Sequence, residues 1–314
     1  MKVLVTGANK FLGSHLVDRL VAENEEVIAL DPTGGRGFIT KLARIYRQDY
    51  SAATLEKIFE KERPDYVCHF SVDDTIATSF ERPLENANHI LSTLMLLELC
   101  KRYSIKRIIY ASSTAVYGNP QYLPCDEVHP LHPVSPLGVT QQTIESYLYF
   151  YWVNFGLDHT ILRNANVYGP RQSASREGGI VSVLIERMLR AQEVILNGDG
   201  MQERDFLFFS DFIDATVAAL RLQERKTKRA LPVDFVYNVG SGESVSINDL
   251  FSLLKDKIPY ERKPVKGPQK PCEVYVMSLD SSRGMKALGW KPKISLDEGL
   301  DRTIFWFKKE LKIK

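Results

Sequence analysis

Short, mostly apolar runs alternate with longer amphipathic stretches along the first half of the chain. The apolar runs predict buried strands, and they occupy residues 3–5, 27–30, 66–70, 107–110 and 159–162. The stretches between them predict helices over residues 11–23, 53–61, 84–103 and 136–155. Strands that are apolar on both faces and alternate with helices are typical of a parallel sheet covered on both sides. The pattern therefore predicts an α/β fold with a doubly wound parallel sheet.

The pattern becomes less regular after about residue 164. A turn rich in Gly, Pro and Arg occupies residues 168–172, and a helix is predicted near 181–191. The strand-like run 206–209 and the helix after it, 211–222, are expected to return to the main sheet. Short elements follow, with a last helix near 297–310. We therefore expect a second, smaller lobe that is assembled from discontinuous pieces.

Composition narrows the possible partners and the expected environment. The 314 residues carry a formal net charge of only +2, which favours neither a nucleic-acid nor a membrane-surface partner. The four cysteines do not show the paired spacing of metal ligands, so no metal site is predicted; they are Cys68, Cys100, Cys125 and Cys272. The first predicted strand begins near residue 2, and no apolar run is long enough to span a bilayer. We expect a soluble cytoplasmic protein.

The first predicted strand runs into a glycine-containing turn that opens a helix, Thr6-Gly7-Ala8-Asn9-Lys10-Phe11-Leu12-Gly13. Glycine suits such a turn because backbone must approach a pyrophosphate, which then lies over the helix N-terminus. Asp31, after the second strand, can accept hydrogen bonds from both hydroxyls of an adenosine ribose and would repel a 2′-phosphate. The cofactor prediction is therefore NAD, with Gly7, Asn9, Lys10, Phe11, Leu12, Gly13 and Asp31 as candidate binding residues.

Lys10 stands where a GxxGxxG turn has its middle glycine, and it leaves two interpretations open. Its side chain either adds a positive charge beside the phosphates or crowds them. In the second case the turn belongs to a vestigial dinucleotide-binding fold that no longer holds a cofactor.

Four further stretches carry a family resemblance. They are YASSTAVYG at 110–118, NVYGPRQ at 166–172, NGDG at 197–200 with RDF at 204–206, and LGWKP at 288–292. Together with the glycine turn, they make the chain similar to the extended short-chain dehydrogenase/reductases over essentially its whole length. The resemblance is strongest to the UDP-glucose 4-epimerase-like branch of the NAD-dependent epimerase/dehydratase family.

This resemblance implies a domain organisation and an assembly. Residues 1–165 would form an NAD-binding Rossmann-type domain, which residues 205–240 rejoin. Residues 166–314 would form a discontinuous lobe that binds a nucleotide sugar, most simply a UDP-hexose. Relatives often form homodimers through a four-helix bundle, here built from the helices at 84–103 and 136–155.

The resemblance also assigns roles to single residues. Ser113 matches the catalytic Ser/Thr whose hydroxyl meets the reacting C4 oxygen of the sugar. Asn166 and Arg204 match residues that hold the substrate diphosphate, and a guanidinium suits phosphate oxygens well. Further positions are implied for the nucleotide at Gly179 and Lys270, for the adenine side at Asp49 and Tyr50, and for the nicotinamide side at Phe70, Ser71 and Val72.

The sequence departs from the family pattern at its reaction centre. Relatives carry a Tyr that exchanges a proton during hydride transfer, and four residues later a Lys that lowers the pKa of this Tyr. Leu137 and Gln141 occupy these positions here, and neither side chain can do acid–base work. Candidate replacements by residue type are Tyr117, Tyr147, His129 and His132.

Two function hypotheses follow. The first is an NAD-binding, epimerase-like protein that acts on or binds a UDP-sugar, with C4 oxidation and reduction that is weak, altered or lost. A dehydratase is disfavoured, because relatives with that activity have Asp-Glu where this chain has Thr114 and Ala115. The alternative is a non-catalytic pseudoenzyme that senses a cofactor or sugar nucleotide or acts as a scaffold for an active relative.

Overall fold

The computed structural model describes residues 1–32, 40–70, 75–174, 178–223 and 230–313. Its centre is a seven-stranded sheet in the order β10-β6-β5-β4-β1-β2-β3, in which every neighbouring pair is parallel. The strands are β1 (Lys2–Thr6), β2 (Glu26–Leu30), β3 (Arg44–Tyr46), β4 (Tyr66–His69), β5 (Arg107–Ser113), β6 (His159–Asn164) and β10 (Val236–Val239). The predicted α/β fold with a parallel sheet is confirmed.

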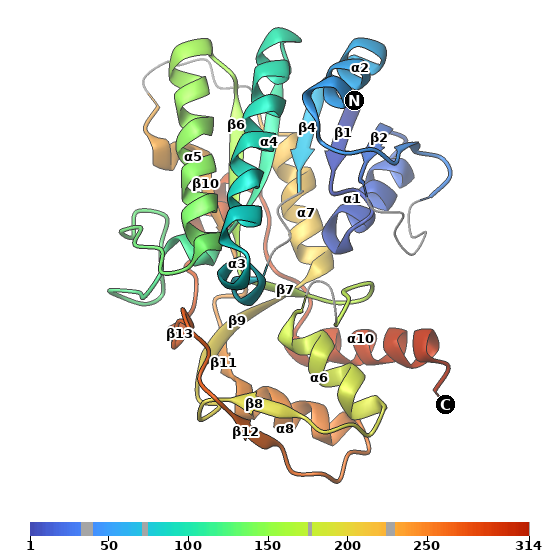
Figure 1. The fold of residues 1–314 in the computed structure, drawn as a ribbon, viewed down its shortest axis with the longest axis vertical. Coiled ribbons are helices and arrows are strands. Elements are labelled where there is room, and N and C mark those ends of the chain that lie inside the picture. The colour runs from blue at the N-terminus through green and yellow to red at the C-terminus, as the bar shows by residue number, and fades with distance from the viewer. Residues whose placement is uncertain (33–39, 71–74, 175–177, 224–229, 314) are drawn as a thin grey trace.

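Helices cover both faces of this sheet, as Figure 1 shows. On one face, α1 (Phe11–Ala22) and α7 (Phe209–Leu220) share an apolar core with Val3 and Val5. On the other face, α2 (Ala52–Glu62), α4 (Pro83–Arg102) and α5 (Pro136–Phe155) pack around a second core that includes Leu4 and Ile28. Successive residues of β1 thus point into opposite cores, which is why its sequence is apolar throughout.

The smaller lobe has its own sheets and core. Its four-stranded sheet contains β7 (Asn166–Tyr168), β9 (Glu203–Phe208), β11 (Ser244–Ser246) and β13 (Val276–Met277). A separate pair joins β8 (Ile195–Asn197) to β12 (Val265–Gly267). The helices of this part are α6 (Ile180–Leu189), α8 (Ile247–Lys257) and α10 (Leu296–Leu311), and their apolar faces meet in a third core. Two short helices, α3 (Ile76–Glu81) and α9 (Ser282–Leu288), complete the α-helices of the described residues.

One expected strand lies elsewhere than predicted. The run 206–209 was expected in the main sheet, but β9 belongs to the sheet of the smaller lobe. The physical reason is its alternation: Phe206 and Phe208 point into the core of the lobe, whereas Leu207 joins the core beneath α1 and α7. The chain re-enters the central layers only afterwards, with α7 and then β10 beside β6.

None of the helices in the described ranges is long and apolar enough to cross a membrane. The same residues hold no group of three or more His, Cys, Asp or Glu side chains that could bind a metal ion.

Arg107 anchors the beginning of β5. It is only 1% exposed and forms an ion pair of 2.6 Å with Asp158, which is also buried. Its guanidinium also donates to the carbonyl oxygens of Ala219, Leu222 and Gln223 at the end of α7. A cation at a helix C-terminus is electrostatically favourable, so Arg107 fixes α7 against the sheet.

We expect Arg107→Met to lower the free energy of unfolding by about 3 to 5 kcal/mol, because Asp158 would stay buried without its partner. Urea unfolding followed by circular dichroism measures this. The matched control is Arg102→Met, since Arg102 pairs with Glu56 on the surface and its side chain is 59% exposed. That change should cost less than about 1 kcal/mol. Equal losses in the two variants would contradict the assignment.

Candidate active site

Two cavities meet at the carboxyl ends of the central strands, where ligands bind in open α/β sheets. The larger has a volume of about 540 Å³ and the smaller about 190 Å³. Both are lined by the same five residues at their junction, which are Ser113, Leu137, Asn164, Val167 and Gln172. A group bound in one cavity could therefore contact a group bound in the other.

The glycine turn after β1 builds one end of the smaller cavity. Gly7 has a φ of 66°, which favours glycine, and the Lys10 amide donates to its carbonyl oxygen over 3.1 Å. A Cβ placed on Gly13 would lie only 2.0 Å from that same oxygen. Lys10 occupies the N-cap position of α1, and its side chain makes no capping hydrogen bond. The first backbone N–H groups of α1 thus remain suited to an anion, so the turn fits a pyrophosphate.

The structure brings many of the predicted cofactor residues together. Lys10, Phe11, Leu12, Gly13 and Phe70 all line the smaller cavity. Four others lie around the same turn without lining the cavity. The Gly7 amide donates to the Tyr50 hydroxyl over 2.9 Å, and the Asn9 amide donates to an Asp31 carboxylate oxygen over 3.3 Å.

Asp49 lies apart from this group. It is exposed, and one of its carboxylate oxygens accepts hydrogen bonds from Ser51 and Thr54 at the start of α2. Ser71 and Val72, predicted on the nicotinamide side, lie outside the described residues.

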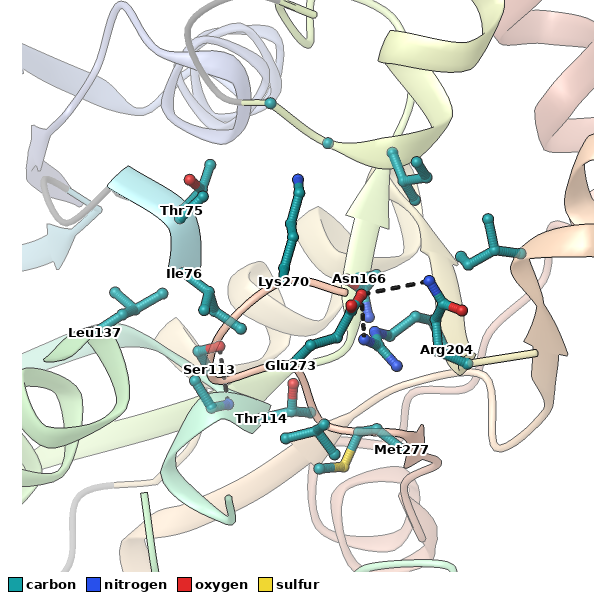
Figure 2. Close-up of a pocket in the computed structure, with 18 of the residues that line it drawn as sticks. Thr75, Ile76, Ser113, Thr114, Leu137, Asn166, Arg204, Lys270, Glu273 and Met277 are labelled. Atoms are coloured by element: carbon teal, nitrogen blue, oxygen red, sulfur yellow. Dashed lines mark hydrogen bonds and ion pairs between the residues drawn. The ribbon is translucent and has the colours of Figure 1, made fainter. Parts of the chain in front are cut away.

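The larger cavity extends from α3 to the small lobe (Figure 2). Ser113, Asn166, Gly179, Arg204 and Lys270, the predicted substrate residues, all line it. The Ser113 hydroxyl oxygen accepts a hydrogen bond from the Ala115 amide over 3.1 Å, so its own proton remains to be donated. Figure 2 shows Arg204 beside Glu273 at the end of the cavity away from Leu137.

Arg204 is held by several acceptors. It donates to the carbonyl oxygen of Glu203 over 2.8 Å and forms an ion pair of 3.4 Å with Glu273. Burial lowers the pKa of the Arg204 guanidinium and Glu273 opposes this shift. Since the ordinary pKa of arginine is above 12, the group stays cationic and suits an anionic ligand.

Leu137 lies in the wall between the two cavities, and Gln141 lines the smaller cavity next to it. Leu137 and Gln141 lie one turn apart on α5 and are 7% and 3% exposed. Leu137 offers only an apolar surface beside Ser113, and the Gln141 side-chain oxygen accepts a hydrogen bond from the Tyr110 hydroxyl. Neither side chain can take up a proton from a reacting hydroxyl group.

A buried polar network that sequence reasoning missed lies below this wall. Glu145 follows Gln141 by one helical turn, accepts a hydrogen bond of 2.5 Å from Ser112 and pairs with Arg163 at 2.6 Å. Arg163 also donates to the Tyr117 hydroxyl over 3.2 Å. The spacing of four residues from Gln141 was the available signal in the sequence, because it places Glu145 on the same face of the helix.

The four residues proposed from the sequence as candidate acid–base groups do not line either cavity as the described residues form them. Tyr117 is fully buried, donates to the Asn238 side chain over 2.6 Å, and burial raises its pKa above the usual range. His129 is buried next to Tyr117 and Tyr122, whereas His132 is exposed in the loop before α5. Tyr147 lies partly exposed on the outer side of α5.

The family model described as "NAD dependent epimerase/dehydratase family" matches residues 3–240. The chain belongs to this family. A putative UDP-glucose 4-epimerase of Methanocaldococcus jannaschii is 36% identical over 310 residues, which is 98% of each chain. The crystal structure of a Thermotoga maritima UDP-glucose 4-epimerase with UDP-glucose is also 36% identical, with a TM-score of 0.93 over 99% of this chain and 100% of that one.

A second solved member of the family is the UDP-glucose 4-epimerase of Thermus thermophilus in complex with NAD. It is 32% identical, with a TM-score of 0.89 over 98% of this chain and 99% of that one. The expectation of an NAD-dependent, UDP-glucose 4-epimerase-like family is therefore confirmed.

Two histidines lie close to the candidate site, His15 partly buried and His69 buried. His15 on α1 stacks on Phe209 with 3.7 Å between ring centroids, and its ring nitrogen lies 2.8 Å from the Pro170 carbonyl oxygen. His69 ends β4, between the hydroxyls of Thr6 and Thr93. Burial lowers the pKa of each histidine to about 3, so both rings are neutral at neutral pH.

These two histidines should make the fold sensitive to mild acid. The unfolded chain takes up protons below about pH 6.5, but the folded protein does not until about pH 3. Stability should therefore fall with decreasing pH across this window, by up to about 1.4 kcal/mol per pH unit for each histidine. We expect His15→Gln to reduce the slope of unfolding free energy against pH between 6.5 and 4.5. An unchanged slope in His15→Gln would disprove the prediction.

Proposed function

We propose that the protein binds NAD in the smaller cavity and a UDP-sugar in the larger one, with C4 oxidation and reduction that is weak, altered or lost. One observation carries the proposal. Ser113 and Leu137 line both cavities at their junction, and Gln141 lines the smaller one. By the family resemblance, Leu137 and Gln141 would stand where relatives have their Tyr and Lys. The binding parts of the site are thus present beside an apolar residue in place of the proton acceptor.

The smaller cavity suits NAD because residues of the glycine turn line it at the N-terminus of α1, whose first N–H groups favour an anion such as a pyrophosphate. Bound NAD would supply a hydride acceptor for C4 of the sugar and a hydride donor for the return step. The residues of the turn would hold the phosphates, and Asp31 would accept hydrogen bonds from the adenosine ribose. We propose that Lys10 adds positive charge on the phosphate side.

The larger cavity suits a sugar nucleotide because cationic and amide side chains line it opposite Ser113. Arg204, Lys270 and Asn166 would bind the diphosphate, and Gly179 would contact the nucleotide. The sugar would then extend toward Leu137, with its C4 hydroxyl accepting a hydrogen bond from the Ser113 hydroxyl. A UDP-hexose is the substrate class that the named relatives support.

The loss of the acid–base pair sets the expected level of activity. Ser113 can donate or relay a proton, but its neutral hydroxyl is too weak a base to take up and keep a proton from the substrate. A single positioned acid–base group commonly contributes about 10²- to 10⁴-fold to a rate. We therefore expect a turnover rate reduced by at least this range relative to an epimerase with both groups.

The alternative is a pseudoenzyme that binds the same ligands without turnover, as a sensor or as a scaffold for an active relative. Leu137 favours this alternative, since an apolar side chain between the two ligands does nothing for proton transfer. The two hypotheses share their ligands and differ in chemistry. Turnover therefore decides between them.

The test is an NMR turnover assay with purified protein, NAD and a panel of UDP-hexoses. We expect the native protein to form little or no epimer or 4-keto product, and Leu137→Tyr/Gln141→Lys to raise the rate by about 10²-fold or more if the site is dormant. Leu137→Phe/Gln141→Lys is the matched control, because it restores the ring and the charge without the phenol hydroxyl. Product from the native protein at a rate typical of enzymes, about 10 s⁻¹, would refute the proposed loss of activity. Absence of gain in the Tyr/Lys variant, with both ligands still bound, would support the pseudoenzyme.

We also propose that the protein is a homodimer and that it works in the cytoplasm. Helices α4 and α5 pack side by side (Figure 1) and together expose a row of apolar side chains. These are Leu84, Leu91 and Met95 on α4, and Val139, Phe150 and Val153 on α5. Their helical spacing places them on one surface, as a four-helix bundle with a second copy requires. The four cysteines are free, which suits a reducing compartment.

The dimer is tested by light scattering coupled to size-exclusion chromatography. We expect twice the chain mass for the native protein and a shift to the monomer for Leu91→Glu/Val153→Glu, because two carboxylates would be buried at the interface. The control is Phe305→Glu, since Phe305 is 73% exposed on α10, outside this surface. A native monomer at about 50 μM, well above the dissociation constant of a stable dimer, would rule out the assembly.

A further inference from the structure

A hydrogen-bonded pair at the edge of the smaller cavity has a role that the proposed function leaves open. Tyr110 lies on β5 and is 1% exposed, and its hydroxyl donates to the side-chain oxygen of Gln141. Tyr110 itself does not line either cavity, whereas Gln141 lines the smaller one. The tyrosine therefore reaches the site only through the amide that it binds.

The orientation of the Gln141 amide follows from the protonation of Tyr110. Burial raises the pKa of the Tyr110 hydroxyl well above its usual value, and nearby Glu145 adds to this shift. The hydroxyl thus keeps its proton and donates it, and the oxygen of the Gln141 amide is the acceptor. The amide nitrogen must then point away from Tyr110. Glu145 does not compete for it, because its carboxylate is engaged by Ser112 and Arg163.

The tyrosine ring is itself held in place. The imidazole of His69 stacks on it with 5.8 Å between ring centroids and 26° between ring planes. His69 is fixed by hydrogen bonds of 2.7 Å to Thr6 and 2.9 Å to Thr93. Thr93 donates its own proton to the His89 carbonyl oxygen, so it accepts from His69. This chain of contacts extends from α4 through β4 to β5 and leaves Tyr110 little freedom to rotate.

We propose that Tyr110 is a positioning residue that fixes the Gln141 amide with its NH₂ group toward the smaller cavity, where it donates a neutral hydrogen bond to an oxygen of the bound dinucleotide. The inference rests on the proposed function, since NAD is the ligand. A lysine at position 141 would bring a positive charge close to the nicotinamide, which is cationic in NAD⁺ and neutral in NADH. The neutral amide avoids this repulsion of the oxidised form. The Tyr110–Gln141 pair thus favours the binding of NAD⁺.

The test is a double-mutant cycle on NAD⁺ affinity, measured by isothermal titration calorimetry with the full-length protein. We expect Tyr110→Phe to weaken NAD⁺ binding by about two- to tenfold, the range of one neutral hydrogen bond, and Gln141→Met to do the same. The double variant should be no weaker than Gln141→Met alone, because Tyr110 acts only through the amide. If the losses of NAD⁺ affinity in the two single variants instead multiply in the double variant, Tyr110 acts through the fold, and the inference is overturned.

Two further measurements separate this inference from the proposed function. Gln141→Lys should weaken NAD⁺ more than NADH, so that the ratio of the two dissociation constants rises; an unchanged ratio would overturn the inference. Tyr151→Phe is the control, because Tyr151 lies on α5 like Gln141 but donates to Glu98 of α4, and neither residue lines a cavity. This variant should leave NAD⁺ affinity unchanged. If the native protein does not bind NAD⁺ at millimolar concentration, the proposed function fails together with this inference. If it binds while Tyr110→Phe is indistinguishable from native, only the inference fails.

Discussion

The site depends on a buried ion pair between Glu145 on α5 and Arg163 on β6. Both side chains are less than one-tenth exposed and lie 2.6 Å apart, so each neutralises a charge that would otherwise be costly to bury. Glu145 also holds Ser112 on β5, and Arg163 reaches Tyr117. The pair thus fixes α5 against two central strands. Because Gln141 lies about one turn and Leu137 about two turns before Glu145 on the same helix, the ion pair also sets their distance from Ser113.

The sequence predicted those elements whose signals are local. The helix expected over residues 136–155 has these bounds in the structure, because Ser135 caps its first turn, Pro136 begins it and Gly156, with a φ of 73°, ends it. The glycine turn is similarly local. The expected place of the run 206–209 was wrong, since the sheet that a strand joins depends on partners distant in the sequence. β9 contributes side chains to two cores, which an apolar run by itself does not reveal.

The candidate site also contains residues that motifs identify and residues that depend on contacts distant in the sequence. Ser113, Asn166 and Arg204 could be named from motifs, and the structure places all three around one cavity. The roles of Tyr110, Gln172 and Glu145 could not be assigned in this way, although the first two lie within motifs. Their importance comes from contacts across 30 or more residues of sequence or from a position between two cavities. Motifs identify residues that touch ligands. Other residues orient these ligand-contacting side chains. They are determined by tertiary packing, which cannot be read from the sequence alone.

Leu137 and Gln141 on α5 make physical sense as a pair. Without a phenol at position 137, a lysine at 141 would be a largely buried cation beside an apolar residue, and burying a charge without a partner is costly. Glutamine is neutral, fits the same helical position and offers an acceptor to the buried Tyr110 hydroxyl, which would otherwise lose a hydrogen bond. Leucine in turn fills the wall between the cavities without a polar atom to satisfy. Leu137 and Gln141 therefore give the wall packing and polar satisfaction without a side chain that could accept a proton.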